Sequence, residues 1–210
     1  MKEMYLKYRN NLSNKKKITL FITLVFFIGL VFGSFYITIL DNKEKALIIK
    51  KVSSFFVSNS KLDFGDKLIL FKNSLISNIV YFVTLWFLGL SVIGIPITII
   101  MLFFKGFICG FSIASIFACF KMKGIIAILL YIFPNTIILS LFTMFLCSFS
   151  LKVSLSILDN AIHKKSLNFG SFMGKYFFIL MILILLSVLC ALFDGFINPH
   201  ILNLFTNFTK

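Results

Sequence analysis

The sequence contains few residues of the kinds that carry enzyme chemistry. Among its 210 residues there are only two histidines, His163 and His200, and seven acidic residues. Nucleophilic catalysis needs a base within reach of a serine, cysteine or threonine, and neither histidine lies in an apolar segment. No cluster of His, Cys, Asp and Glu has metal-ligand spacing, and Gly-rich phosphate loops are missing. We therefore expect no enzymatic activity, metal or cofactor.

Arginine is nearly absent as well, since only Arg9 of the 21 basic residues is an arginine. Bidentate recognition of phosphate or carboxylate is therefore scarcely available. The net charge of +14 comes mainly from lysines at the ends of apolar runs, where they meet lipid headgroups. Nucleic acid is not an expected partner. The four cysteines fall inside apolar segments and resemble small buried hydrophobic residues: Cys109, Cys119, Cys147 and Cys190.

What the chain has in abundance is apolar sequence. Hydrophobic residues make up 60% of it, with 29 phenylalanines, whereas soluble domains are nearer ~45–50% apolar. We expect an all-α, polytopic membrane helical bundle that forms a single domain over residues 1–210. Five runs are of a length that crosses a bilayer, and they predict transmembrane helices at about 18–40, 75–93, 97–120, 125–149 and 176–197.

The lysines before the first run suggest how the bundle is oriented. Lys15, Lys16 and Lys17 precede it directly, so the positive-inside rule places residues 1–17 in the cytoplasm. Counted over all the connecting segments, this cluster included, ten basic residues fall on each side, so the total count does not decide the orientation. The bias toward Lys, Ile, Phe and Asn is typical of an AT-rich bacterial genome, so five crossings would put residues 41–73 and 198–210 outside a bacterial cytoplasmic membrane.

These two outer segments carry apolar residues at helical spacing. We expect amphipathic helices on the outer leaflet, the second one started by Asn198-Pro199. A partner protein could instead occupy either stripe. The residues that would face such a partner are Phe64, Leu68 and Phe71 in the loop and Pro199, Ile201 and Phe205 in the tail.

Small residues at a spacing of four predict the close helix contacts. We expect the third and fifth crossing helices to pack together, because each carries such a stripe. The stripe residues are Gly106, Gly110, Ala114 and Ala118 in the third helix and Ser187, Ala191 and Gly195 in the fifth.

Prolines predict where helices break or bend. Gly94-Ile95-Pro96 predicts a tight turn between the second and third crossings, with the break at Ile95. Pro134 should kink the fourth helix. It has no amide to donate, so the Leu130 carbonyl must find another partner within the bundle.

Three polar residues within the apolar runs are candidates for a functional site: Lys105, Asn135 and Asp194. At ~1.5 Å per residue, Lys105 and Asp194 differ in depth by about 15 Å, which is too far for a direct ion pair. We expect Asn135 and the Leu130 carbonyl to be the partners of Lys105. The alternatives are a lysine that snorkels to the headgroups and, for Asp194, an ordinary interfacial carboxylate.

A family resemblance emerges from these motifs taken together. The chain resembles the stage II sporulation protein M family in Leu85-Trp86-Phe87-Leu88-Gly89, Gly94-Ile95-Pro96, Phe104-Lys105-Gly106, Gly110-Phe111, Pro134-Asn135 and Leu192-Phe193-Asp194 followed by Pro199. The resemblance covers nearly the whole chain in the expected order. Asp194 departs from the pattern, because glutamate is more usual there.

The resemblance implies a five-helix protein without catalytic activity, a scaffold for peptidoglycan hydrolysis during engulfment of the forespore in sporulation. It would work in the mother-cell membrane with stage II sporulation proteins D and P, which carry the cell-wall chemistry. The competing function is a transporter or channel subunit that uses Lys105 and the broken helices as a solute path. The sequence leaves the oligomeric state open, a homo-oligomer included.

Overall fold

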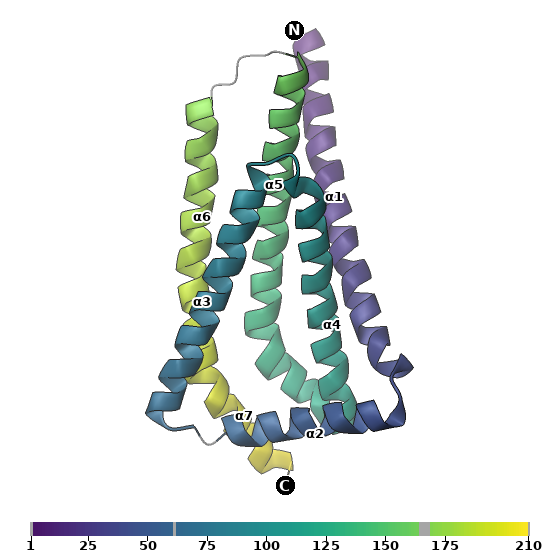
Figure 1. Ribbon diagram of the computed structural model, residues 1–210, viewed down its shortest axis with the longest axis vertical. Helices are drawn as coiled ribbons and strands as arrows, with labels where there is room; N and C mark the ends of the chain where they lie inside the picture. Colours follow the sequence, from purple (N-terminus) through teal and green to yellow (C-terminus); the bar gives the residue numbers. More distant parts are fainter. Residues whose placement is uncertain (1, 61, 164–168, 210) are drawn as a thin grey trace.

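The computed structural model describes residues 2–60, 62–163 and 169–209, and no strand occurs among them. This confirms the all-α fold. Long helices run side by side along one axis, and the two ends of the chain lie at opposite ends of it (Figure 1). Helices η1 and η2 are π-helical. In chain order the helices are α1 (Lys2–Ile39), α2 (Asn42–Asn59), α3 (Phe64–Gly89), α4 (Gly94–Ala127), η1 (Ile128–Ile137), α5 (Ile138–His163), α6 (Phe169–Leu192), η2 (Phe193–Ile197) and α7 (Asn198–Thr209).

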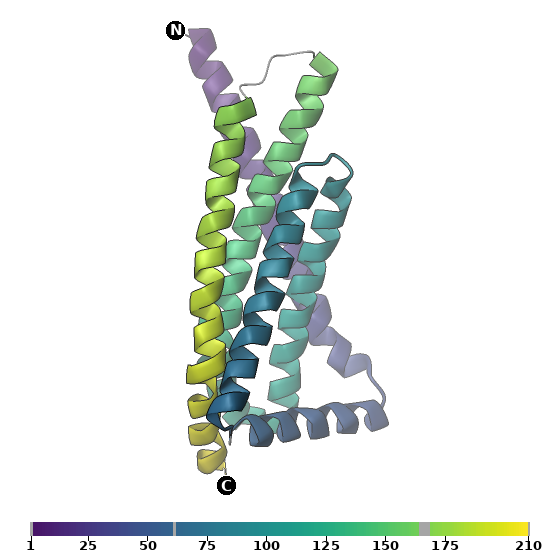
Figure 2. The ribbon, with the colours of Figure 1, turned by 60° about the vertical axis from the view of Figure 1, so that its left-hand side comes forward.

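Four described stretches are long and apolar enough to cross a membrane: Lys16–Ile39, Phe64–Gly89, Gly94–Asp159 and Met173–Asn207. The third has 66 residues, which as one straight helix would measure about 100 Å, over three times the hydrocarbon core. Its helix is interrupted at Lys121, where φ is 50° and ψ is −130°, and α4 and α5 run antiparallel (Figures 1 and 2). This stretch is therefore long enough, and folded back in the right way, for the two crossings that the sequence predicts in it.

The helix ends differ from the predicted segments because amphipathic turns extend the apolar runs. Helix α3 begins at Phe64, so residues 64–73, predicted to belong to the surface loop, form the first turns of a helix long and apolar enough to cross the membrane. Helix α5 continues to His163 and α6 begins at Phe169, so most of the chain between the predicted crossings at 125–149 and 176–197 is helical. In that extension Val153 is buried, and the Ser154 hydroxyl donates to the Ser91 carbonyl at 2.7 Å.

The turn between α3 and α4 occupies residues 90–93, slightly before the predicted break at Ile95. Pro96 lies in the first turn of α4, where proline is tolerated because the amide it lacks would have no helical partner. A Cβ added to Gly94 would fall on the Leu88 carbonyl. The close return of the chain therefore requires glycine at this position.

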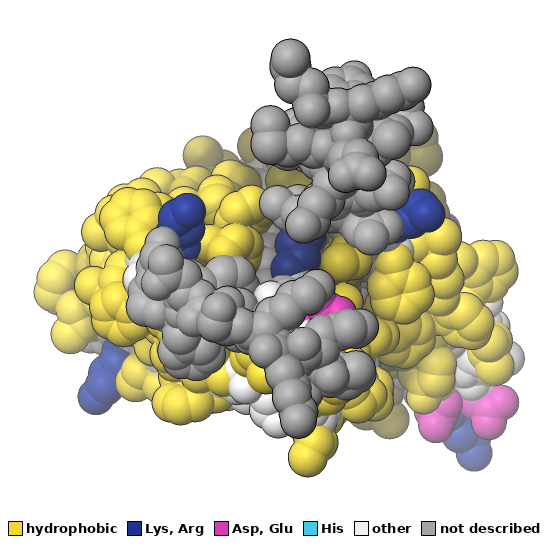
Figure 3. Space-filling view, turned by 90° about the horizontal axis from the view of Figure 1, so that it is seen from above, with side chains coloured by type: hydrophobic (Ala, Val, Ile, Leu, Met, Phe, Trp, Pro, Cys, Tyr) yellow, Lys and Arg dark blue, Asp and Glu magenta, His cyan; other side chains and the backbone are white. Residues whose placement is uncertain are grey.

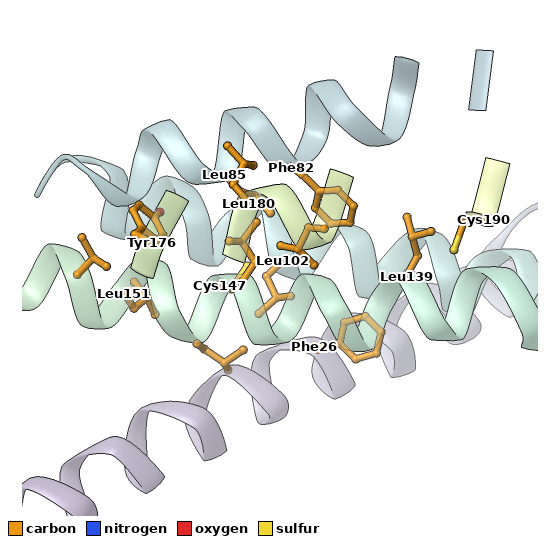
Figure 4. Packing of buried hydrophobic residues seen from close by; sticks show 14 residues of the cluster. Phe26, Phe82, Leu85, Leu102, Leu139, Cys147, Leu151, Tyr176, Leu180 and Cys190 are labelled. Atoms are coloured by element: carbon orange, nitrogen blue, oxygen red, sulfur yellow. The ribbon is translucent and has the colours of Figure 1, made fainter. Parts of the chain in front are cut away.

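The main hydrophobic core lies where α1, α3, α4, α5 and α6 meet (Figure 4). One buried residue from each of these helices represents it: Phe26, Phe82, Leu102, Leu146 and Leu183. Outside this core, every crossing helix also exposes large apolar side chains, as expected of a surface in contact with lipid. Examples that are more than half exposed are Phe35, Phe87, Ile108, Phe145 and Leu185. Viewed along the long axis, hydrophobic side chains occupy most of the described outline (Figure 3).

A second, smaller core fixes α2 across one end of the bundle (Figures 1 and 2). Its centre is Phe56, which is only 2% exposed. The Phe56 ring lies 5.0 Å from that of Phe120, 5.7 Å from that of Phe205 and 5.8 Å from that of Tyr131, measured between centroids. Helix α2 is therefore anchored to α4, η1 and α7 by an aromatic side chain.

The small-residue stripe of α4 faces α1, so the predicted packing of the third crossing against the fifth is wrong. Cβ atoms added to Gly106 and Gly110 would fall on the carbonyl oxygens of Phe26 and Leu30 in α1. In the same way, Gly29 and Gly33 of α1 leave room for the backbone of α4 at Phe103 and Phe107. Two glycine pairs of equal spacing thus let the two backbones touch.

Farther along this α4 stripe the packing is looser, since Ala114 is half-buried and Ala118 is exposed beside a pocket that Ile37 of α1 and Ile48 of α2 also line. The stripe of the last crossing also has a different neighbour from the one predicted. Ser187 and Ala191 are fully buried, and a Cβ added to Gly195 would lie 2.7 Å from the Phe71 Cβ and 3.0 Å from the Lys67 carbonyl oxygen. The partner of Gly195 is therefore α3.

Candidate functional site

A cluster of polar side chains surrounds Asp194 near the end of the bundle where α2 and α7 lie. The Ser74 hydroxyl of α3 donates to Asp194 Oδ2 at 2.6 Å, and Asn198 Nδ2 donates to Asp194 Oδ1 at 2.8 Å. Asn78 in turn donates to the Ser74 hydroxyl at 3.4 Å, and Asn135 lies close enough to interact with the carboxylate. Neutral donors from three parts of the chain thus hold this carboxylate.

Two π-helical segments bring these residues together. Asn135 and Pro134 lie in η1, Asp194 lies in η2, and Asn198 directly follows η2. In a π-helix the donor to a carbonyl is the amide five residues later, so the Leu130 carbonyl is matched with the Asn135 amide and not with the one that Pro134 lacks. At the predicted kink the helix therefore changes from α-helical to π-helical hydrogen bonding. Such π-helical turns occur frequently at functional sites.

The second proline also lies in a continuous helical path. We predicted that Asn198-Pro199 starts a separate helix on the membrane surface, but α6, η2 and α7 follow one another without a break, and the apolar stretch extends from Met173 to Asn207. Both Pro199 and Asn198 are buried. The Asn198 side chain therefore donates a hydrogen bond to Asp194 and does not cap a helix at the surface.

The polar cluster lines a cavity of about 280 Å³ between α2, α3, η1 and the η2–α7 segment. Asp194, Ser74, Asn135 and Asn198 supply its polar wall, and the apolar and aromatic wall includes Phe55, Tyr131 and Leu202. The Oδ1 atoms of Asn135 and Asn198 are buried and receive no hydrogen bond from the described residues. A buried acceptor without a donor is destabilising, so these two oxygens call for an explanation.

Lys105 lies apart from this cluster and contacts an aromatic ring. Its ammonium is 5.0 Å from the centroid of the Tyr81 ring in α3, within the range of a cation–π interaction. The Tyr81 hydroxyl donates to the Met101 carbonyl of α4 at 3.3 Å. The predicted partners, Asn135 and the Leu130 carbonyl, make no hydrogen bond to Lys105, whose described contact is the Tyr81 ring, so that prediction is wrong.

The partner of Lys105 could have been found from the hairpin that α3 and α4 form. In an antiparallel pair, residues at similar distances from the turn lie at similar depth. Tyr81 is eight residues before the end of α3 at Gly89, and Lys105 is eleven residues after the start of α4 at Gly94. Aromatic residues near the middle of α3 were therefore the neighbours to consider.

Lys105 and Asp194 make no direct ion pair, as predicted. Their contacts on α3, Tyr81 and Ser74, are seven residues apart, which corresponds to about 10 Å along the helix. The two charges thus occupy different levels of the bundle. Ser74 and Tyr81 both belong to α3, so this one helix contacts both charged residues. We had predicted neither of them as a site residue.

The six residues predicted to face a partner have different surroundings. Pro199 is buried, and Phe205 is only 4% exposed, so the prediction is wrong for these two. Phe71 and Phe64 pack at 6.3 and 6.2 Å from the Phe196 ring, and Ile201 is half-buried. Phe64 and Leu68 remain mostly exposed at the start of α3.

Comparison with known proteins identifies a family. The family model described as SpoIIM, stage II sporulation protein M, matches residues 22–199. The matched region extends from α1 to the start of α7 and contains both the polar cluster and Lys105. No curated protein and no solved structure matches the chain significantly.

Proposed function

This chain belongs to the stage II sporulation protein M family, and we propose that it is a non-catalytic membrane scaffold for peptidoglycan-degrading enzymes. The family match and the apolar helices make it a sporulation-related, multi-pass membrane protein. In the proposed role it assembles and localises the enzymes during engulfment of the forespore. Stage II sporulation proteins D and P are the proposed partners, and they carry out the cell-wall chemistry on the outer side of the mother-cell membrane.

The observation that carries this proposal is the position of α2. This helix lies across the end of the bundle (Figure 2) and is anchored there by Phe56, while several of its other side chains are exposed. Leu47 and Val57 are both 57% exposed, and lysines accompany them on the same helix at positions 43, 45, 50 and 51. An anchored helix with exposed apolar and basic residues is suited to hold a second protein at the membrane surface.

Co-purification tests the proposal. The full chain is co-expressed with stage II sporulation proteins D and P, extracted in mild detergent and recovered by a tag on the scaffold. We expect both enzymes to be recovered, and the variants Leu47→Ser and Val57→Ser to reduce their recovery several-fold. The matched control is Leu204→Ser, since Leu204 is equally apolar and 73% exposed but lies on α7.

Three results would contradict the proposal. The first is no recovery of either enzyme with the wild-type chain. The second is equal loss of recovery in the Leu204→Ser control, which would show that α2 is not the contact surface. The third is peptidoglycan hydrolysis by the purified chain alone, which would make the protein an enzyme.

A solute path is the competing function, and the cavity beside Asp194 is the observation that favours it. Lys105 does not line that cavity. Lys105→Met in reconstituted liposomes discriminates the two functions when flux of ions or solutes and recovery of the partners are measured together. Altered flux with unchanged recovery would favour transport over the scaffold.

A further inference from the structure

An open groove between α1 and α5 combines positive charge with an apolar wall. Helix α1 contributes most of its lining, which begins at Lys16 and ends at Phe27, and α5 contributes Lys152. The volume of the groove is about 750 Å³, within the range of about 300–1,000 Å³ that is usual for ligand sites. Two lysines that are far apart in the sequence therefore share one space large enough for a ligand.

The two lysines lie at the same end of the groove, where hydrogen bonds join the two helices. The Lys152 ammonium of α5 donates to Thr19 Oγ1 of α1 at 3.4 Å, and the hydroxyl oxygens of Thr19 and Ser148 are 2.9 Å apart. Lys16 precedes Thr19 by three residues, which is about 4.5 Å along the helix. Among the described residues that line the groove, the charged ones are these two lysines and none is acidic. This end of the groove is therefore positively charged.

The apolar wall continues from the charged end along a single face of α1. Leu20, Leu24 and Phe27 follow Lys16 at steps of four, four and three residues, and residues at these steps lie on the same side of a helix. The three apolar side chains are about half exposed or more, whereas a different face of α1, represented by Ile22, is buried in the main core. The groove thus presents a charge at one end and exposed hydrocarbon along the rest of its length.

The length of the groove matches one leaflet of a bilayer. From Lys16 to Phe27 the chain advances by eleven residues, about 16 Å of helix, and half of a ~30 Å hydrocarbon core is about 15 Å. Lys16 is also the first residue of a stretch long and apolar enough to cross a membrane, and the ends of such stretches lie at the level of the lipid headgroups. A molecule in the groove would therefore have its polar end among headgroups and its apolar part within the hydrocarbon.

We propose that this groove binds one anionic phospholipid, with the lipid phosphate between Lys16 and Lys152. The acyl chain then lies along the apolar wall from Leu20 to Phe27. Lysine binds phosphate as a point charge, and basic pockets between transmembrane helices are suited to anionic headgroups. In the predicted orientation the groove opens to the cytoplasmic leaflet. The inference goes beyond the proposed scaffold function and does not depend on it, because it rests on the charge, length and depth of the groove.

The first experiment measures lipid binding by the full chain. Protein purified in maltoside micelles is mixed with equal amounts of phosphatidylglycerol and phosphatidylcholine that carry the same acyl chains, and native mass spectrometry measures which lipid is retained. We expect phosphatidylglycerol to be retained several-fold more, because phosphatidylcholine has no net negative charge. In a second arm, phosphatidylglycerol should raise the midpoint of thermal unfolding in a saturable way, whereas glycerol phosphate, which has the headgroup without the chains, should not.

Selective retention of phosphatidylglycerol together with saturable stabilisation supports the proposal. Equal retention of the two lipids would overturn it, since the groove would then not recognise charge. Equal stabilisation by glycerol phosphate would also overturn it, since a soluble phosphate compound would then account for the binding. These comparisons use the wild-type chain, so they do not depend on whether any variant folds.

Variants then test the location. Lys16→Gln and Lys152→Gln each remove one positive charge and should each weaken binding of phosphatidylglycerol about fivefold. The double variant should weaken it about 25-fold if the two effects add. Lys17→Gln is the matched control, because Lys17 is exposed in the same turn of α1 but does not line the groove. Unchanged binding by the folded double variant would overturn the proposal, and so would a loss in Lys17→Gln equal to that in Lys16→Gln.

Discussion

Trp86 of α3 and Tyr176 of α6 are joined by reciprocal hydrogen bonds. Trp86 Nε1 donates to the Tyr176 carbonyl at 3.3 Å, and the Tyr176 hydroxyl donates to the Trp86 carbonyl at 2.9 Å. Their rings are stacked at a centroid separation of 5.3 Å and an angle of 21°. Both polar atoms are therefore satisfied within an apolar region, where an unpaired donor would be costly.

We predict that Tyr176→Phe destabilises the bundle by about 1 kcal/mol, the usual net value of one hydrogen bond. The substitution keeps the buried ring and its stacking on Trp86 and removes only the hydroxyl. Reversible unfolding in detergent mixtures measures the change. Tyr36→Phe is the control, since Tyr36 is 46% exposed and loss of its hydroxyl should change the stability by less than about 0.5 kcal/mol. Equal losses in the two variants would show that the hydrogen bond contributes nothing.

The contact between α1 and α4 gives the second prediction. Gly110→Leu should destabilise the protein by ~1–3 kcal/mol through overpacking, because an added side chain meets the Leu30 backbone. The Ser34 hydroxyl, which donates to the Gly110 carbonyl at 3.2 Å, would be displaced as well. Thermal melting and expression level measure the effect.

The control for this prediction is Gly65→Leu in the first turn of α3. A Cβ at Gly65 has no neighbour within 4 Å, so the same change of side chain meets open space. We expect its melting to stay close to that of the wild type. If Gly110→Leu melted like Gly65→Leu, the α4 stripe would face lipid and not α1.

The third prediction concerns Lys105 and Tyr81. A double-mutant cycle with Lys105→Met and Tyr81→Leu should give a coupling free energy of about 0.5–2 kcal/mol, the range of cation–π interactions from exposed to desolvated sites. Unfolding in detergent measures the four proteins of the cycle. The cycle Lys105→Met with Tyr36→Phe is the control, and it should show no coupling. Additive effects of Lys105 and Tyr81 would mean that the ring does not stabilise the charge.

The fourth prediction concerns orientation, which stays a prediction from the lysines at positions 15 to 17. In a chain whose four native cysteines have been replaced, Ser58→Cys should react with an impermeant maleimide added from outside the cell. Ser58 is exposed on α2, so access does not depend on local opening. Lys16→Cys, at the other end of the bundle, should react only after the membrane is opened. The reverse pattern would invert the topology.

The sequence alone was sufficient for those features that depend on short stretches of chain. The length of an apolar run decides whether it crosses a bilayer, because backbone hydrogen bonds in lipid must be satisfied within the helix. The predicted crossings at 97–120 and 125–149 likewise leave a gap where the chain reverses at Lys121. The all-α fold and the family were also predicted correctly. Both follow from short sequence patterns and from the order in which these patterns occur.

Helix partners were decided only by the tertiary structure. The stripe at Gly106 and Gly110 indicated a close contact with another helix. Both the Gly29–Gly33 pair of α1 and the stripe that ends at Gly195 could have formed this contact. The pair Gly29 and Gly33 does so because its spacing and depth complement those on α4. Complementarity between two surfaces is a property of both helices and of how the bundle closes, so one stripe does not predict it.

The polar site shows the same division between sequence and structure. Lys105, Asn135 and Asp194 stand out in the sequence because charge and amide groups are costly in lipid. Their contacts with Tyr81, Ser74 and Asn198 depend on depth and rotation, which the hairpin of α3 and α4 and the two π-helical segments set. Local chemistry thus determined which residues need partners, whereas only the packed helices decided which partners they have.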